Sequence, residues 1–172
     1  MFKKSYLQSL RCRWQTVWLL ALCAPWWLSS GALAATATTT FNATATVVAS
    51  CIVVATNVAF GVYSGSQLDG TGLVTATCVN GTSYTLALNV GTGSGATLAS
   101  RRLTGPSSQT LTYSLYQDSG RSAVWGDVLG TDTIASSGSG IAQIYTMYGR
   151  IPASQYPSAG SYSDTISVTL TY

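Results

Sequence analysis

The sequence of 172 residues contains no histidine and no glutamate, and its lysines are confined to Lys3 and Lys4. A Ser–His triad or a Cys–His pair therefore cannot be assembled from it. Five aspartates remain, but no spacing singles out two of them as a catalytic carboxylate pair. They also lack the repeated ligand spacing of a calcium-binding loop. We expect a protein that is not an enzyme and that holds no cofactor and no metal ion.

The first 34 residues have the pattern of a secretion signal. A basic start precedes an apolar run over residues 17–28, and an A-x-A cleavage motif ends at Ala34. The alternative is a retained membrane anchor, which would need a run of about 20 apolar residues, longer than this one. We therefore predict a signal peptide over residues 1–34 and export from the cytoplasm.

Basic residues are scarce once this signal is removed. Residues 35–172 hold four arginines against five aspartates, a formal net charge of −1. Nucleic-acid binding depends on a basic face, and this composition does not supply one. We expect no nucleic-acid partner.

Cysteine is equally scarce after cleavage, since only Cys51 and Cys78 remain. An isolated pair in an exported chain is usually a disulfide. Two free thiols are the alternative, and a metal site would lack further ligands. We predict a Cys51–Cys78 disulfide.

The remaining sequence is rich in the residues that β-strands favour, with many Thr, Val and Tyr. Short strand-like runs alternate with Gly/Ser-rich stretches that are too short to be more than loops. This pattern predicts one all-β domain, either a sandwich or a small barrel. The runs lie near residues 40–48, 51–60, 73–79, 83–90, 109–116, 141–151 and 162–172.

Two local features give sharper expectations. Asn80-Gly81 separates two strand-like runs and supplies the two positive φ angles of a type I′ turn, which predicts a β-hairpin. Trp125, the one tryptophan after Ala34, is either a core residue or part of a carbohydrate-stacking surface, and the core is the expected role.

Alternation of polar and apolar residues marks both ends of the exported chain. Residues 165–172 alternate with period 2, as a strand with one buried face does. A second alternating stretch covers residues 40–47, immediately behind the signal. An exposed apolar strand edge is a template for another chain, so the partner of these two strands is the central question.

Nine short phrases, taken in order together with the cysteine pair, resemble the spore coat protein U domain family. That family includes subunits of archaic chaperone–usher pili such as the Csu pilus. The resemblance covers essentially the whole exported chain. The phrases are Ala49-Ser50-Cys51, Ala59-Phe60-Gly61-Val62-Tyr63, Val74-Thr75-Ala76-Thr77-Cys78, Tyr84-Thr85-Leu86, Arg101-Arg102-Leu103, Leu111-Thr112-Tyr113-Ser114-Leu115-Tyr116-Gln117-Asp118, Trp125-Gly126, Tyr148-Gly149-Arg150-Ile151 and Gly160-Ser161-Tyr162-Ser163-Asp164-Thr165-Ile166.

The resemblance implies an incomplete immunoglobulin-like β-sandwich that lacks its last strand. In such subunits a periplasmic chaperone lends a strand to the open groove. At the outer-membrane usher, the N-terminal segment of the next subunit replaces it, which is a form of β-augmentation. The implied partners are other pilus subunits, in a homo- or heteropolymer, a chaperone and an usher. The implied location is the cell surface, reached through the periplasm, with a role in adhesion or biofilm formation.

The resemblance also implies a role for each terminal segment. Residues 35–50 would be the donor segment and residues 51–172 the pilin domain. The expected donor side chains are Phe41, Ala43, Ala45 and Val47, in a register uncertain by about two residues because small Ala dominates the face. The expected core-facing side chains of the acceptor strand are Ile166, Val168, Leu170 and Tyr172.

Three alternatives stay open at this point. A secreted coat or matrix protein could use the same fold without an usher. A tip adhesin is less favoured, because adhesins usually carry an extra receptor-binding domain. An eight-stranded outer-membrane barrel also suits a terminal alternating strand, although the glycine-interrupted strands, the cysteine pair and the lack of aromatic girdles disfavour it.

Overall fold

The structure is a computed structural model that describes residues 34–172. The predicted signal peptide therefore lies outside the described residues, apart from Ala34. Among the described residues, those up to Ala43 belong to a different unit from residues 44–172. Between residues 34 and 50 there is no helix or strand, and every side chain is exposed. Among the described residues, no helix has the length and apolarity needed to cross a membrane.

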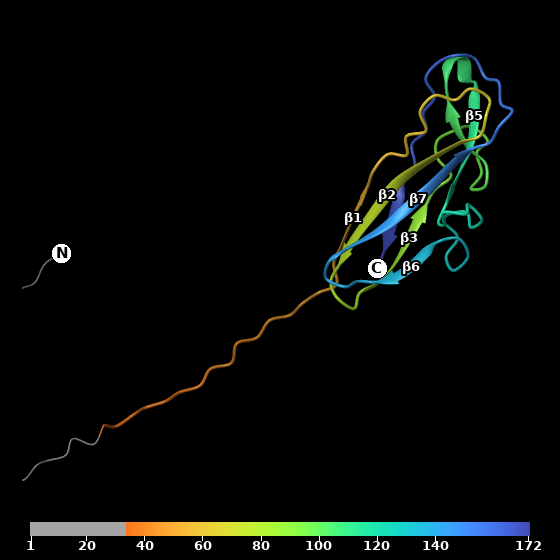
Figure 1. The fold of residues 1–172 in the computed structure, drawn as a ribbon. Helices are drawn as coiled ribbons and strands as arrows, with labels where there is room; N and C mark the ends of the chain where they lie inside the picture. The colour runs from red at the N-terminus through yellow and green to blue at the C-terminus, as the bar shows by residue number, and fades with distance from the viewer. Residues whose placement is uncertain (1–33) are drawn as a thin grey trace, which may run out of the picture. The chain divides into compact units, whose positions relative to one another are not determined.

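Two antiparallel sheets make up the domain (Figure 1). The strand order is β1–β2–β7–β5–β4 in the five-stranded sheet and β6–β3–β8 in the three-stranded sheet. This confirms the predicted all-β sandwich. The strands are β1 (Cys51–Ala55), β2 (Leu68–Cys78), β3 (Ser83–Leu88), β4 (Arg101–Thr104), β5 (Thr110–Tyr116), β6 (Ile134–Ser137), β7 (Ala142–Ile151) and β8 (Val168–Thr171), and one 3₁₀ turn covers Pro106–Ser108.

The core lies between the two sheets and follows from the period-2 alternation of the strands. Alternate residues of β2 and β3 are buried and meet across the interface: Val74, Ala76 and Cys78 on one side, Tyr84, Leu86 and Leu88 on the other. Trp125 is fully buried among them, and its indole nitrogen donates to Leu86 O (3.2 Å). The core role expected for Trp125 is therefore confirmed.

The predicted disulfide is also confirmed. Cys51 and Cys78 are bonded, and they face each other in the β1–β2 ladder. The bond thus ties the first residue of the edge strand β1 to the last residue of β2, which is an interior strand of the five-stranded sheet. By loop-closure arguments, a cross-link of this span stabilises the folded chain by about 3–4 kcal/mol.

The hairpin predicted at Asn80-Gly81 is wrong. The two strands beside it belong to different sheets, because β2 pairs with β1 and β7 while β3 pairs with β6 and β8. Gly81 has φ 79°, whereas the φ of Asn80 is not positive, and Thr82 N donates to Val79 O (3.0 Å). This is the pattern of a type II turn, which needs a positive φ at its third residue only. The turn carries the chain from one sheet to the other.

Arg101 is a fully buried cation that connects several backbone segments around Trp125. Its guanidinium donates to four backbone carbonyls, those of Leu88, Asn89, Leu98 and Trp125, at 2.7–3.3 Å. Burial lowers the pKa of the Arg101 guanidinium. These carbonyls lie at and just after the end of β3, in the loop before β4 and at Trp125. Arg101, the first residue of β4, therefore ties the end of β3 and the start of β4 to Trp125.

Several strand boundaries differ from the sequence-based ones. Residues 40–48 form no strand, because an isolated alternating segment has no ladder partner. At the C-terminus the only strand is β8, which is shorter than the strand predicted over residues 162–172. β2 starts earlier than expected, at Leu68, despite its glycines. The short strands β4 and β6 were not predicted.

Candidate functional site: an apolar groove between two strand edges

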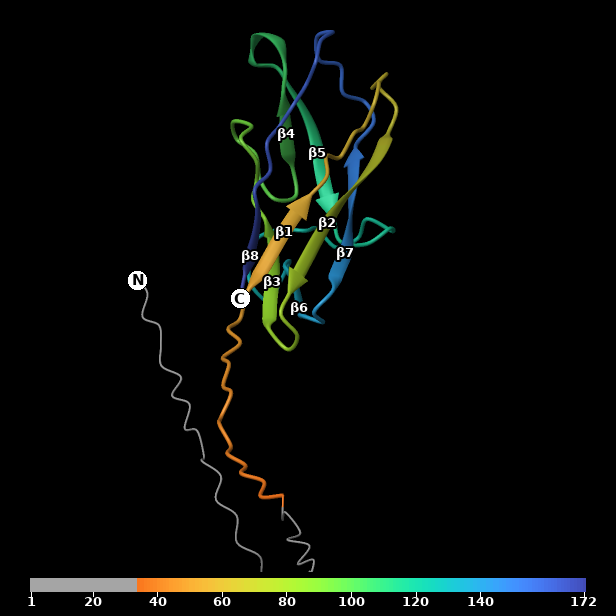
Figure 2. The same cartoon turned by 90° about the vertical axis from the view of Figure 1, so that its left-hand side faces the viewer.

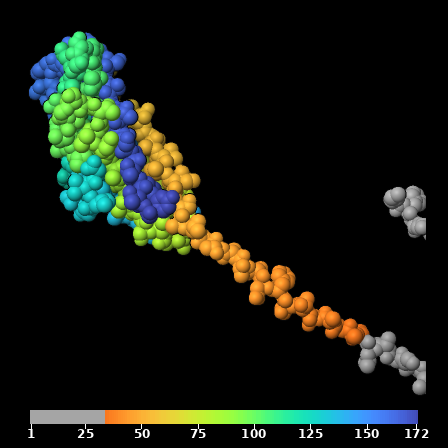
Figure 3. All heavy atoms as spheres, turned by 180° about the vertical axis from the view of Figure 1, so that it is seen from behind, coloured from red at the N-terminus to blue at the C-terminus, as the bar shows by residue number. Residues whose placement is uncertain are grey.

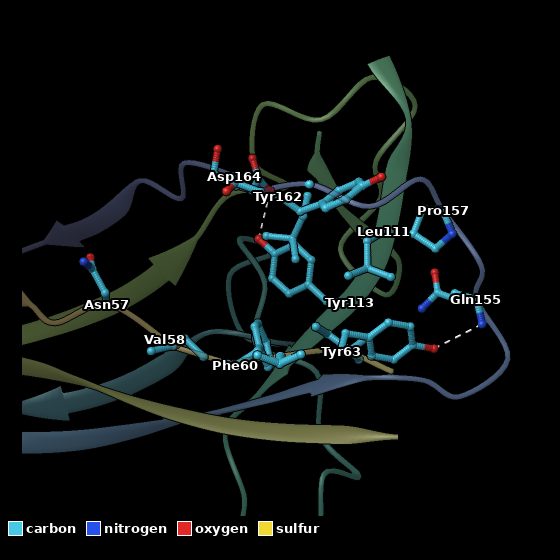
Figure 4. A pocket seen from close by; sticks show the side chains of 18 of the residues that line it. Asn57, Val58, Phe60, Tyr63, Leu111, Tyr113, Gln155, Pro157, Tyr162 and Asp164 are labelled. Atoms are coloured by element: carbon cyan, nitrogen blue, oxygen red, sulfur yellow. Dashed lines mark hydrogen bonds between the residues drawn. The ribbon is translucent and has the colours of Figure 1, made fainter. Parts of the chain in front are cut away.

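A groove of about 1150 Å³ opens between the segment that follows β1 and the segment that precedes β8. Residues 55–65 form one wall, residues 155–168 form the other, and side chains of β5 and β7 form the floor. In Figure 4, Val58, Phe60 and Tyr63 face Tyr162 and Asp164 across the groove, with Leu111 and Tyr113 between them. Below the groove, β1 and β8 lie against each other, as Figures 2 and 3 show.

The first wall, residues 57–64, is here called the lip. Its start is fixed at Thr56, whose backbone nitrogen donates to Leu73 O and whose Oγ1 accepts from Leu73 N, both at 2.8 Å. Its end is fixed by the Tyr63 hydroxyl, which donates to Pro152 O (2.8 Å) and accepts from Gln155 N (3.1 Å). Between these points, no backbone group of residues 57–64 is hydrogen-bonded within the part of the chain that is described.

Side-chain packing, rather than a ladder, holds the middle of the lip. Gly70, Gly72 and Gly149 leave a recess in the inner face of the five-stranded sheet. A Cβ on any of them would come within 2.6–3.2 Å of Val58 or Phe60. The lip side chains occupy that space, and the Phe60 ring also meets Tyr113 edge-on, with centroids 5.8 Å apart. The glycines therefore explain why β1 stops at Ala55, since beyond it the chain leaves the ladder to insert these side chains.

The second wall belongs to residues 162–171, here called the acceptor segment. Its inner edge is paired along its length, but with successive partners. Ser163 exchanges two backbone hydrogen bonds with Thr104 of β4 (2.8 and 3.1 Å). Ser167 is bonded to both the backbone and the side chain of Asn89, and β8 then pairs with β3. The segment thus passes from the edge of one sheet to the edge of the other.

Asp164 anchors the acceptor segment to the groove floor. One carboxylate oxygen accepts from the Tyr113 hydroxyl (2.8 Å), and the other accepts from Thr92 N and Thr92 Oγ1 (2.7 and 2.8 Å). Burial and the hydrogen bond to Asp164 together raise the pKa of the Tyr113 hydroxyl, which stays a donor. Gly91 makes room for this arrangement, because a Cβ there would collide with the carboxylate.

The outer edge of the acceptor segment is open at residues 164–166, ahead of β8. Backbone groups of alternate strand residues point to opposite edges. Since Ser163 and Ser167 bond inward, Asp164 and Ile166 present their backbone groups to the groove. Neither makes a backbone hydrogen bond among the described residues. The groove therefore has an apolar floor, and the backbone on each side of it has hydrogen-bonding groups without a partner among the described residues.

The four predicted acceptor residues differ in how far they are buried. Ile166, Val168 and Leu170 are half-buried and pack on the core. Tyr172 is 60% exposed and lies beyond β8, so the prediction that it faces the core is wrong in this structure. The predicted donor side chains are all exposed, with Phe41 at 88% and Val47 at 81%.

Sequence reasoning missed the lip and the residues at 155–160. The signal that could have revealed the lip is the pair Gly70 and Gly72, because alternating glycines in a strand mark a close approach of other atoms. Gln155 carried no signal, although its amide pairs with both Thr112 N (2.7 Å) and Thr112 O (3.0 Å) as a neighbouring strand would. Within residues 34–172, no cluster of three or more ligating side chains could hold a metal ion.

Removing the Asp164 carboxylate tests whether it positions the acceptor segment. We expect Asp164→Ala to lower the free energy of unfolding by about 3 kcal/mol, because the Tyr113 hydroxyl and the Thr92 groups lose a charged acceptor. Urea unfolding followed by Trp125 fluorescence measures the change. Asp127→Ala is the matched control, since Asp127 is exposed and has no hydrogen bond. Equal midpoints for the two variants would contradict the assignment.

Comparison with known proteins identifies the family to which the chain belongs. The model of the Spore Coat Protein U domain family matches residues 37–169. Protein U of Myxococcus xanthus is 32% identical over 160 residues, covering 83% of this chain and 89% of that protein. The fold is similar to that in the CsuC–CsuE chaperone–tip adhesion subunit pre-assembly complex from archaic chaperone–usher Csu pili of Acinetobacter baumannii. The TM-score is 0.58 and the identity 22%, over 74% of this chain but only 41% of that one. The chain, matched by the family model over most of its length, belongs to the Spore Coat Protein U domain family.

Proposed function

We propose that this protein is a structural subunit of a surface pilus, assembled head to tail by chaperone–usher donor-strand exchange. The observation that carries the proposal is the groove between the lip and the acceptor segment, with its apolar floor and two unpaired edges. The fibre would serve adhesion or biofilm formation. The protein's role is structural and not catalytic.

A β-strand is the occupant that fits such a groove. Its backbone groups can bond to an edge on each side, and alternate side chains can enter the floor between Phe60, Tyr113 and Ile166. The part of the acceptor segment that lines the groove covers residues 162–168, so a strand paired with it would span about 23 Å. The donor segment, residues 35–50, is long enough to supply it.

We take the donor from another copy, because residues 34–49 are exposed and make no backbone hydrogen bond among the described residues of this chain. Their alternation presents Phe41, Ala43, Ala45 and Val47 on one face, as a row of pockets requires. A chain that offers a strand at one end and a groove elsewhere makes heterologous contacts, which build an open fibre. Before assembly, a periplasmic chaperone would fill the groove, and an outer-membrane usher would mediate the exchange.

A secreted coat or matrix protein is the second candidate. The family name and the 32% identity to Protein U favour it. Both candidates need the groove to be filled, but only the pilus needs an usher. A chaperone gene and an usher gene beside this one would favour the pilus, and their absence would favour the coat.

Deletion of residues 36–48 tests the assembly mechanism directly. With chaperone and usher co-expressed, the full-length chain should give surface fibres and an SDS-resistant ladder of multimers. The deletion variant should give neither, while its chaperone complex persists in the periplasm, because the groove is intact. Fibres formed by the deletion variant would refute donor-strand exchange by this segment.

A further inference from the structure

The outer face of the five-stranded sheet carries an unpartnered apolar patch. Ile52 and Val54 of β1, Leu73 of β2 and Ile144 of β7 point away from the core, with exposed fractions of 66%, 62%, 39% and 64%. The ladder register places Val54 and Ile144 on either side of Thr75, with Leu73 two residues from Thr75 along β2 and Ile52 two residues from Val54 along β1. We call these four residues the β1 patch.

Charge is confined to the other half of the same face. There, Arg150 pairs with Asp69 (2.8 Å), and Arg121 reaches the same carboxylate (3.4 Å). The other side chains within and beside the β1 patch are uncharged: Thr75 lies between Val54 and Ile144, and Thr146 lies opposite Leu73. An uncharged contact surface therefore begins directly at β1 and ends where the ion pairs start.

Chain connectivity decides what lies next to this patch. Ile52 follows Val47, at the end of the donor strand, by five positions, a reach of at most about 17 Å. This step rests on the proposed function: once the donor segment is inserted, the copy of the chain that accepts it must lie beside the β1 patch. The occupant is thus a second copy, held close by a covalent tether.

The accepting copy has a matching apolar surface. All six ladders of the described domain are antiparallel, so we take the donor to run antiparallel to the acceptor segment. Its C-terminal end then emerges where the acceptor segment begins, next to residues 155–160. At that end of the groove, Tyr156 is 85% exposed and Val62 of the lip is 91% exposed. The Tyr156 ring lies beside Gly65, three residues along the chain from Val62, and both Val62 and Tyr156 line the groove; we call these two residues the rim.

We propose that the β1 patch of each subunit packs against the rim formed by Val62 and Tyr156 of the subunit that accepts its donor segment. The contact is heterologous and repeats at every junction along the fibre. It is small, but the donor segment tethers the two surfaces and raises their effective concentration. The contact sets the angle between successive subunits and does not determine whether they join.

A photo-crosslinking amino acid at Val54 tests the proposal in assembled fibres. We expect crosslinks to peptides of a neighbouring subunit that contain residue 62 or 156. The same group at Thr71, an exposed position next to Asp69, is the control and should not label these peptides. In crosslinkable fibres, Tyr156→Ser should lower the Val54 crosslink about ten-fold, because it removes a large apolar partner.

The outcomes separate this inference from the proposed function. Absence of fibres from the unmodified chain would refute the pilus assignment and this contact with it. Normal fibres in which Val54 labels nothing, or labels another surface, would refute the contact alone. Tyr156→Ser fibres should still form, with altered bending in electron micrographs, whereas loss of the fibres would show that the rim acts in assembly rather than in setting the angle.

Discussion

Ala43→Asp or Ala45→Asp should abolish surface fibres while leaving the chaperone-bound subunit in the periplasm. In the proposed register, both alanines insert into narrow positions over the groove floor, which consists of side chains such as Leu111 and Met147. An unpaired carboxylate buried there costs several kcal/mol. The parent domain should fold normally, because residues 34–50 take no part in its ladders. Electron microscopy and shear release measure the fibre yield.

Thr44→Asp is the matched control for both changes. Period-2 alternation puts residue 44 on the opposite face of the donor strand, where a charge remains in water. We therefore expect fibre yields close to those of the unmodified chain. Equal yields from Ala43→Asp, Ala45→Asp and Thr44→Asp would rule out this register, and intact fibres in all three would remove the segment from consideration as the donor.

A second large effect is expected when the groove is filled in cis. Adding a copy of residues 38–50 after Tyr172, through a short flexible linker, should convert an aggregation-prone chain into a soluble monomer. The added strand would run antiparallel to β8 and would satisfy the open edges at the lip and at Ile166. Burial of about 400 Å² of apolar surface corresponds to about 10 kcal/mol before the ordering cost of the strand is subtracted. Thermal unfolding and size-exclusion chromatography measure the gain.

The fused copy also provides its own control. Introducing Ala45→Asp into the appended strand only should return the chain to the unstable, aggregating state, although the domain is unchanged. A third outcome would overturn the incomplete-fold interpretation altogether: an unfused exported chain that is already monomeric and equally resistant to heat.

The sequence identified the strands whose burial alternates cleanly and failed where glycine or side-chain packing overrides propensity. The strands β3 and β7 could be predicted because one face is buried along all of β3 and along the second half of β7, from Met147 to Ile151. The turn at Asn80-Gly81 could not be typed, since a glycine with positive φ suits both a hairpin and a crossover between sheets, and only the long-range pairing of β2 with β7 decides between them.

The groove was predicted in outline and not in detail. Alternation in residues 165–172 indicated an open strand edge, and the observed unpaired edge at Ile166 agrees with it. The lip was not predicted, because the sequence pattern extends the first strand to residue 60. The departure of residues 57–64 from the ladder depends on glycines that are distant in the sequence, such as Gly149. The exposed position of Tyr172 does not follow from the alternation, because the ladder with β3 stops at the pair Thr85–Thr171.

The disulfide has a mechanical consequence for a fibre under load. A pull transmitted along the donor segment enters the domain at Ser50, one residue before Cys51. Because Cys51 is bonded to Cys78, the load passes directly into the interior strand β2 and cannot peel β1 from the edge of the sheet. The lip lies inside the covalent loop that this bond closes, so tension on the N-terminal tether cannot draw it out straight. In a fibre assembled as proposed, tension would still pass through the grip on the neighbour's strand, but the disulfide would keep that tension from unravelling the lip that forms one wall of the groove.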